Sequence, residues 1–129
     1  MFFGLDGLDT ANKSGWHRVA RQTTKEILVA TQKFTGVIPP VVVPDTEDHQ
    51  LDVASFERSI NRMIDAGVDG LFFLGSSGEV VFSTDERRRQ IVAEAVRIVD
   101  HRVPVLVGII DTETERMIEH GKVAQELGA

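Results

Sequence analysis

The 129-residue sequence contains no cysteine, which excludes disulfides and thiolate metal sites. No apolar run approaches the roughly 18 residues that a membrane-spanning helix requires. The first residues also lack the positive segment and long apolar stretch of a secretory signal. We therefore expect a soluble, cytoplasmic protein that does not contact a membrane.

Basic side chains are in the minority, with 14 lysines and arginines against 20 acidic residues and a net charge of -6. Only Arg87, Arg88 and Arg89 form a block, and they fall on a predicted helix. Nucleic acid is disfavoured as a partner because a nucleic-acid-binding surface needs an excess of positive charge. We interpret the three arginines as a solvated helix face.

Three short apolar runs recur along the chain at a constant spacing. They begin at Val37, Gly70 and Val103, which are 33 residues apart in both intervals. This spacing is close to the roughly 30 residues of a strand, a helix and two loops. The runs are continuous rather than alternating, which is typical of buried parallel strands. Strands are predicted over 37–43, 70–74 and 103–107, the first irregular because prolines 39 and 40 remove ladder donors.

A helical pattern follows each run. The first helix is predicted to begin after Asp52 as N-cap and to stop at Gly67, with one apolar stripe formed by Val53, Phe56, Ile60, Met63 and Ile64. The second is predicted to begin with Ser83 and Glu86 in capping-box spacing, and the third with Thr112 and Glu115. The alternation predicts an α/β fold, specifically the first three βα units of a (β/α)₈ TIM barrel.

Residues 1–33 lie outside this repeat. Their segment 14–31 is compatible with a helix that places Trp16, Val19, Ala20, Thr23 and Ile27 on one side. We predict two parts: an N-terminal, partly helical arm over 1–33, and an incomplete barrel domain over 34–129. An eight-unit barrel takes about 250 residues, so we expect this chain to be a fragment, a truncated product or part of an oligomeric assembly.

The segment Gly75-Ser-Ser-Gly-Glu79 directly follows a predicted buried strand and holds two hydroxyls between two glycines. Ligands bind at this end of the strands in parallel α/β folds, and glycines let the backbone approach a ligand. Ser76 and Ser77 could hold a small carboxylate without adding charge. The alternative is a plain turn whose serines satisfy backbone groups.

Other candidate residues carry weaker signals. We interpret Glu79 as a residue that caps or orients the backbone rather than as a general acid. Asp111 follows the third predicted strand and either faces the same pocket or caps a turn. His49, His101 and His120 show no metal-ligand spacing, so neither a metal nor a cofactor is expected.

From residue 34 to 129 the chain resembles the dihydrodipicolinate synthase and N-acetylneuraminate lyase family of pyruvate-dependent aldolases. The resemblance rests on the order and spacing of seven motifs: Phe34-Thr-Gly-Val, Leu51-Asp52, Asp65-Ala-Gly-Val-Asp-Gly, Gly75-Ser-Ser-Gly-Glu79, Asp85-Glu-Arg, Val103-Pro-Val-Leu-Val-Gly108 and Ala124-Gln-Glu-Leu-Gly-Ala129. It implies a lyase or aldolase that acts on pyruvate or a related 2-keto acid, and a homo-oligomer.

The resemblance also implies roles for the loop. Ser76 would belong to a proton relay with tyrosines, and Ser77, with Gly75 and Gly78, would help to bind the keto-acid carboxylate. The synthases usually carry two threonines there, and their Thr-Pro-Phe after the first strand is Val43-Pro44-Asp45 in this chain. These differences indicate a divergent member of the family and leave its substrate open.

The Schiff-base lysine and the relay tyrosines of such enzymes come from later strands. The lysines present, at positions 13, 25, 33 and 122, do not end a predicted strand, and the sequence has no tyrosine. We therefore expect the isolated chain to be inactive. Two other functions remain open: a non-catalytic module that binds a small acid, and a phosphate-binding α/β domain, for which a sheet order of 2-1-3 would be diagnostic.

Overall fold

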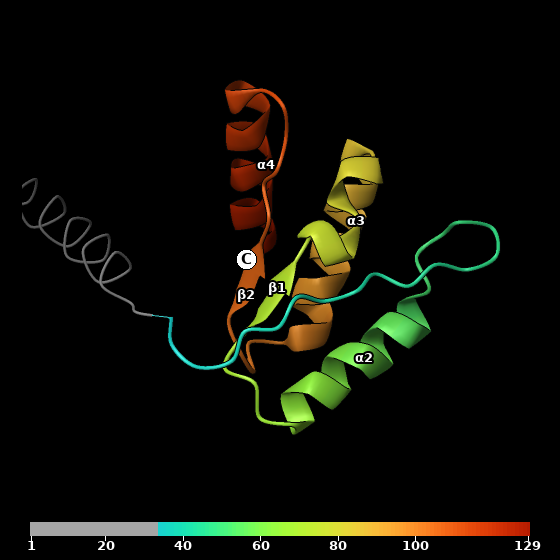
Figure 1. The fold of residues 1–129 in the computed structure, drawn as a ribbon, viewed down its shortest axis with the longest axis vertical. Coiled ribbons are helices and arrows are strands. Elements are labelled where there is room, and N and C mark those ends of the chain that lie inside the picture. The colour runs from blue at the N-terminus through green and yellow to red at the C-terminus, as the bar shows by residue number, and fades with distance from the viewer. Residues whose placement is uncertain (1–33) are drawn as a thin grey trace, which may run out of the picture. The chain divides into compact units, whose positions relative to one another are not determined.

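A computed structural model of the protein describes residues 34–129 (Figure 1). The predicted helix over 14–31 lies outside the described residues, and the division at residue 33 stays a prediction. Residues 35–129 form one compact unit. Its helices and strands follow one another in the alternating order expected for βα units.

Helix α2, Val53–Asp65, begins and ends as the sequence predicts. The carboxylate of Asp52 accepts a hydrogen bond from the backbone N–H of Ser55 at 3.0 Å, which satisfies one free donor of the first turn. The helix stops before Gly67, which has a φ of +83° that residues other than glycine rarely adopt. The predicted stripe faces the core, since Phe56 and Ile60 are fully buried.

Strands β1, Leu71–Phe73, and β2, Val105–Val107, pair in parallel with Phe72 opposite Leu106. Both lie inside the predicted ranges and are shorter. Leu71 and Phe73 are fully buried and Phe72 is only partly so, because successive side chains of a strand point to opposite faces. One face of this sheet therefore packs against helices more closely than the other.

The first predicted strand is a single bridge rather than a strand. Within 37–43, Pro40 forms a parallel bridge with Phe72, with hydrogen bonds from the Phe72 N–H to Pro39 O at 3.0 Å and from the Val41 N–H to Phe72 O at 2.8 Å. Two consecutive prolines have no N–H to donate, so a regular ladder cannot form. Figure 1 shows this cyan segment passing alongside β1.

The order of these segments across the sheet is sequential. Residues 37–43 contact β1, and β1 contacts β2. This is the order of a barrel, and it contradicts the 2-1-3 order that would have indicated a phosphate-binding doubly wound domain.

Two further helices pack on each other, α3, Asp85–Val99, and α4, Thr114–Leu127, and α3 also packs on β2. Two predicted caps are wrong. The N-cap of α3 is Thr84, whose hydroxyl accepts from the Arg87 N–H at 3.2 Å, whereas the Ser83 hydroxyl reaches back to the Glu79 carbonyl. The N-cap position of α4 is Glu113 and not Thr112.

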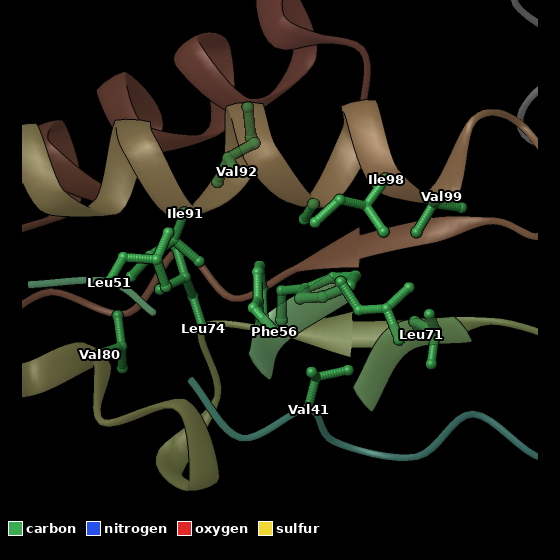
Figure 2. Close-up of a cluster of buried hydrophobic side chains, with 14 residues drawn as sticks. Val41, Leu51, Phe56, Leu71, Leu74, Val80, Ile91, Val92, Ile98 and Val99 are labelled. Atoms are coloured by element: carbon green, nitrogen blue, oxygen red, sulfur yellow. The ribbon is translucent and has the colours of Figure 1, made fainter. Parts of the chain in front are cut away.

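The core is one cluster of buried apolar side chains from α2, β1, η3, α3, α4 and the loops, and partly buried valines of β2 pack against it (Figure 2). The α3 helix contributes the largest share, with Ile91, Val92, Ala95, Ile98 and Val99. The rings of Phe56 and Phe73 meet edge to face with their centres 5.8 Å apart, which joins α2 to β1. Within 34–129, no helix is both long enough and apolar enough to cross a membrane.

Candidate functional site at the carboxyl ends of the strands

The loop that follows β1 is a tight turn with its two hydroxyls outward. Ser76–Gly78 form the short 3₁₀ helix η2, and Val80–Phe82 form a second one, η3. Ser76 and Ser77 are exposed, whereas Gly75 and Gly78 are buried. Among the hydrogen bonds of residues 34–129, none involves either serine hydroxyl. Both hydroxyls are therefore available to a ligand.

The backbone of the turn leaves donors free as well. Its internal hydrogen bonds run from the N–H of Gly78 to the carbonyl of Gly75 and from the N–H of Glu79 to the carbonyl of Ser76, at 3.0 and 3.1 Å. The N–H groups of Ser76 and Ser77 therefore have no role within the turn. N–H groups at the start of a turn carry partial positive charge and favour an anion.

Residues on either side of this turn have a left-handed backbone conformation. Leu74 and Glu79 both have a φ of +53°, an uncommon conformation for residues with a side chain. Leu74 is buried, and the contacts around it hold the conformation in place. Glu79 is exposed, and its side chain makes no capping bond with either adjoining 3₁₀ turn. The predicted capping role of this side chain is therefore wrong, and its role in orienting the backbone stays a prediction.

The end of β2 closes against this turn. The Gly108 N–H donates to the Phe73 carbonyl at 2.8 Å, and a β-carbon on Gly108 would lie 2.3 Å from the Leu74 carbonyl oxygen. Gly75 is equally confined, because a β-carbon there would lie 2.6 Å from the ring of Phe72. Glycine at position 108 lets the two strand ends approach each other, and glycine at position 75 lets the turn pass close to the Phe72 ring.

Asp111 takes part in an ion-pair network and does not join the serines. Its carboxylate accepts from the Thr112 N–H at 2.7 Å and lies 3.1 Å from Arg116 Nε and 3.0 Å from His120 Nε2. The hydrogen bond with His120, then those from Thr112 and Arg116, hold the pKa of Asp111 well below its usual value. Of the two interpretations of Asp111, these contacts favour the structural one.

The arginine block was misinterpreted as a solvated face. Arg87 pairs with Asp45 and donates to the His49 carbonyl at 3.1 Å, and Arg88 donates to the Ile110 carbonyl at 2.7 Å. Only Arg89 is exposed. Partners 22 to 42 residues away in the chain leave no local signal, so the sequence could not reveal these contacts.

Within residues 34–129, no group of three or more histidine, aspartate or glutamate side chains is placed to hold a metal ion. The free donors at the end of β1 are hydroxyls and amides. Such a set suits a small anion more than a cation.

Comparison with known proteins agrees with this geometry. Residues 33–129 match the Dihydrodipicolinate synthetase family. The chain belongs to that family. The predicted family and the barrel class are thus confirmed, with the described residues forming a part of the α/β barrel of its members.

Individual relatives carry several activities in their names. The chain is 41% identical over 96 residues to the 4-hydroxy-tetrahydrodipicolinate synthase of Salinibacter ruber, covering 74% of this chain and 32% of the relative. It is 47% identical to the structure of YagE from Escherichia coli K12 in complex with pyruvate, with a TM-score of 0.74, covering 76% of this chain and 33% of the other. The N-acetylneuraminate lyase of Mycoplasma synoviae is 28% identical with a TM-score of 0.67, covering 73% of this chain and 32% of that one.

The chain thus spans about a third of the length of the relatives it matches. Their names include a 4-hydroxy-tetrahydrodipicolinate synthase and an N-acetylneuraminate lyase, which differ in the substrate. The family assignment therefore does not select a substrate among them.

Proposed function

We propose that the protein is a Schiff-base-forming lyase of the dihydrodipicolinate synthase family that acts on pyruvate or a related 2-keto acid. The residues described would supply the carboxylate-binding and proton-relay part of its site. The observation that carries the proposal is the turn after β1, with two exposed hydroxyls and free N–H groups at the carboxyl ends of parallel strands.

In this proposal, the Ser77 hydroxyl and the free N–H groups of Ser76 and Ser77 bind the carboxylate of the keto acid, and Gly75 and Gly78 let the backbone approach it. A hydroxyl and partly positive N–H groups hold a carboxylate without a full ion pair, which allows release of the product. Ser76 belongs to the proton relay. This assignment is supported by the exposure of both hydroxyls and by the relatives whose structures hold pyruvate.

The covalent step requires a lysine amine. The amine adds to the keto carbon, the carbonyl oxygen leaves as water, and loss of a methyl proton gives the enamine that attacks an aldehyde. Lys122 is a poor candidate, since it is exposed within α4 and not at the end of a strand. We assign the reactive lysine to a later strand of the barrel, in the two-thirds of the relatives that this chain does not match.

Borohydride trapping tests the proposal directly. The protein expressed from its complete reading frame is incubated with pyruvate, reduced, and analysed by intact mass. A pyruvyl adduct on a single lysine is the expected result. A folded protein that gives no adduct would refute the lyase proposal, and pyruvate binding by that protein in calorimetry would favour the non-catalytic acid-binding module.

Two serine variants test the assignment within the turn. Ser77→Ala should raise the half-saturating pyruvate concentration about 10- to 100-fold, because a hydrogen bond to a charged group contributes roughly 1.5–3 kcal/mol. Ser76→Ala should slow adduct formation with little change in half-saturation. Ser83→Ala is the control, since that hydroxyl points back to the Glu79 carbonyl at 3.5 Å. If all three variants have the same half-saturating pyruvate concentration and the same rate of adduct formation, neither serine has its proposed role.

We also propose that the protein assembles as a homo-oligomer. Val81 and Phe82 on η3 are 67% and 83% exposed, so two adjacent apolar side chains are uncovered in the described residues. Light scattering after size exclusion should give a mass that is a multiple of the chain mass. A monomer at micromolar concentration would refute this proposal.

A further inference from the structure

One side chain of α3 ties together the loops that follow β1 and β2. Arg88 Nη1 donates to the Ile110 carbonyl at 2.7 Å, and Nε of the same guanidinium is 3.3 Å from the Ser83 carbonyl. The side chain is only 11% exposed. A planar guanidinium holds its donors in a fixed fork, so the two carbonyls are kept at a set separation.

The loop after β2 is held from α4 as well. Asp111 lies 4.0 Å from Arg88 Nη1 and 3.1 Å from Arg116 Nε, and Arg116 Nη2 in turn is 3.0 Å from Asp85 at the start of α3. His120 Nε2 contacts the same Asp111 oxygen at 3.0 Å. The positive and negative groups alternate, and the network anchors the loop to both neighbouring helices.

A movement of the loop after β2 would also displace the turn at Ser76–Gly78, here called the serine turn. Gly108 begins the loop, and its N–H is bonded to the Phe73 carbonyl at 2.8 Å. The β-carbon position of Gly108 is 3.4 Å from the backbone nitrogen of Gly75, the residue immediately before Ser76. Backbones this close cannot shift independently.

We propose that Arg88 is a positioning residue for the keto-acid site. By fixing the Ser83 and Ile110 carbonyls, it sets the spacing of the two loops and thereby the orientation of the Ser76 and Ser77 donors. This role rests on the proposed lyase function. Arg88 itself does not contact the substrate, so it acts on how well the carboxylate is held and not on the proton transfers.

The test compares arginines at the two ends of α3. Arg102 bonds the Ile98 carbonyl at 2.7 Å, the Val99 carbonyl at 3.0 Å and the Asn61 side chain at 2.7 Å, at the end remote from the serine turn. Arg102→Met therefore removes a similar set of hydrogen bonds without touching the site. Arg88→Met and Arg88→Lys are the test variants, all made in the protein expressed from its complete reading frame.

Two readouts are combined. Borohydride trapping over a range of pyruvate concentrations separates half-saturation from the limiting rate, and amide hydrogen exchange reports the order of residues 75–83 and 108–112. Arg88→Met should raise the half-saturating pyruvate concentration about tenfold and keep the limiting rate of adduct formation within about twofold of wild type. It should also speed amide hydrogen exchange in both loops. Arg102→Met should change neither.

Arg88→Lys keeps a charge and a long apolar stem but cannot span both carbonyls in a fixed geometry. Arg88→Lys should raise the half-saturating pyruvate concentration about fivefold. If Arg88→Met does not fold, this variant alone tests the positioning role. Half-saturation in Arg88→Lys equal to wild type, or equal shifts in the Arg88 and Arg102 variants, would overturn the positioning role. Absence of any adduct on the wild type would instead refute the proposed function, and the positioning role with it.

Discussion

Replacing Gly108 with alanine tests whether the ends of β1 and β2 are as close as the structure has them. The added β-carbon would lie 2.3 Å from the Leu74 carbonyl oxygen and 2.9 Å from its carbon. Both are backbone atoms, so no side-chain rotation relieves the clash. Ordinary contact begins at about 3.4 Å, and the two backbones must therefore separate by about 1 Å.

The expected destabilisation has two parts. Separation breaks the 2.8 Å hydrogen bond from Gly108 to Phe73, which contributes about 1 kcal/mol. Overpacking at a buried position adds about 1–3 kcal/mol. The free energy of unfolding should therefore fall by about 2–4 kcal/mol. The half-saturating pyruvate concentration should rise as well, because the serine turn moves with Leu74.

Gly70→Ala is the matched control, since Gly70 lies at the other end of the same pair of strands. A β-carbon there would meet its nearest neighbours, Ile38, Pro104 and Leu106, at 3.4 to 3.5 Å, which is ordinary contact. Its unfolding free energy should stay within about 1 kcal/mol of wild type. Denaturant unfolding followed by far-UV circular dichroism measures both variants. A Gly108→Ala protein no less stable than Gly70→Ala would refute the argument.

Three further substitutions test the core, a helix and the ion-pair network. Phe56→Ala should lower the free energy of unfolding by about 3–5 kcal/mol in denaturant titrations, since the ring is fully buried against Phe73; a loss below about 1 kcal/mol would contradict this packing. Gly121→Ala should raise the melting temperature, because alanine is a better helix former by about 1 kcal/mol and its β-carbon would meet Ile109 at an ordinary 3.8 Å; a lower melting temperature would mean that α4 is packed more tightly there. Asp111→Asn should be destabilising at pH 7. Because the folded pKa of Asp111 is depressed, its contribution is present above the unfolded value near 3.9 and is lost as the pH falls further. The difference from wild type in urea unfolding should therefore shrink below about pH 4, and a difference independent of pH would exclude the ion pairs as its source.

Local patterns were sufficient for much of the fold. Asp52 caps α2 and Gly67 follows its end because both signals act within one helical turn. The continuous apolar runs predicted β1 and β2, because apolar β-branched and aromatic runs favour strands of a parallel sheet. The two prolines predicted that the first segment is irregular, because proline has no backbone N–H to donate to a strand ladder.

The errors fall where a residue had two possible partners. Ser83 and Thr84 are both good caps, and only the path of η3 decides that Thr84 takes the position. At α4 the N–H of Thr112 goes to the Asp111 carboxylate, and the helix begins two residues later. Side chains that compete for the same backbone groups leave the exact helix start undecided in a sequence.

The sequence by itself determined the class of fold, the family and the turn with two hydroxyls, because periodicity, glycine placement and motif order are local properties of the chain. Tertiary structure alone decided that Gly108 lies against Leu74 and that Arg88 joins the carbonyls of Ser83 and Ile110. These contacts span up to 34 residues in the chain. They form only when helix packing brings the loops together at one edge of the sheet, and no local pattern encodes that distance.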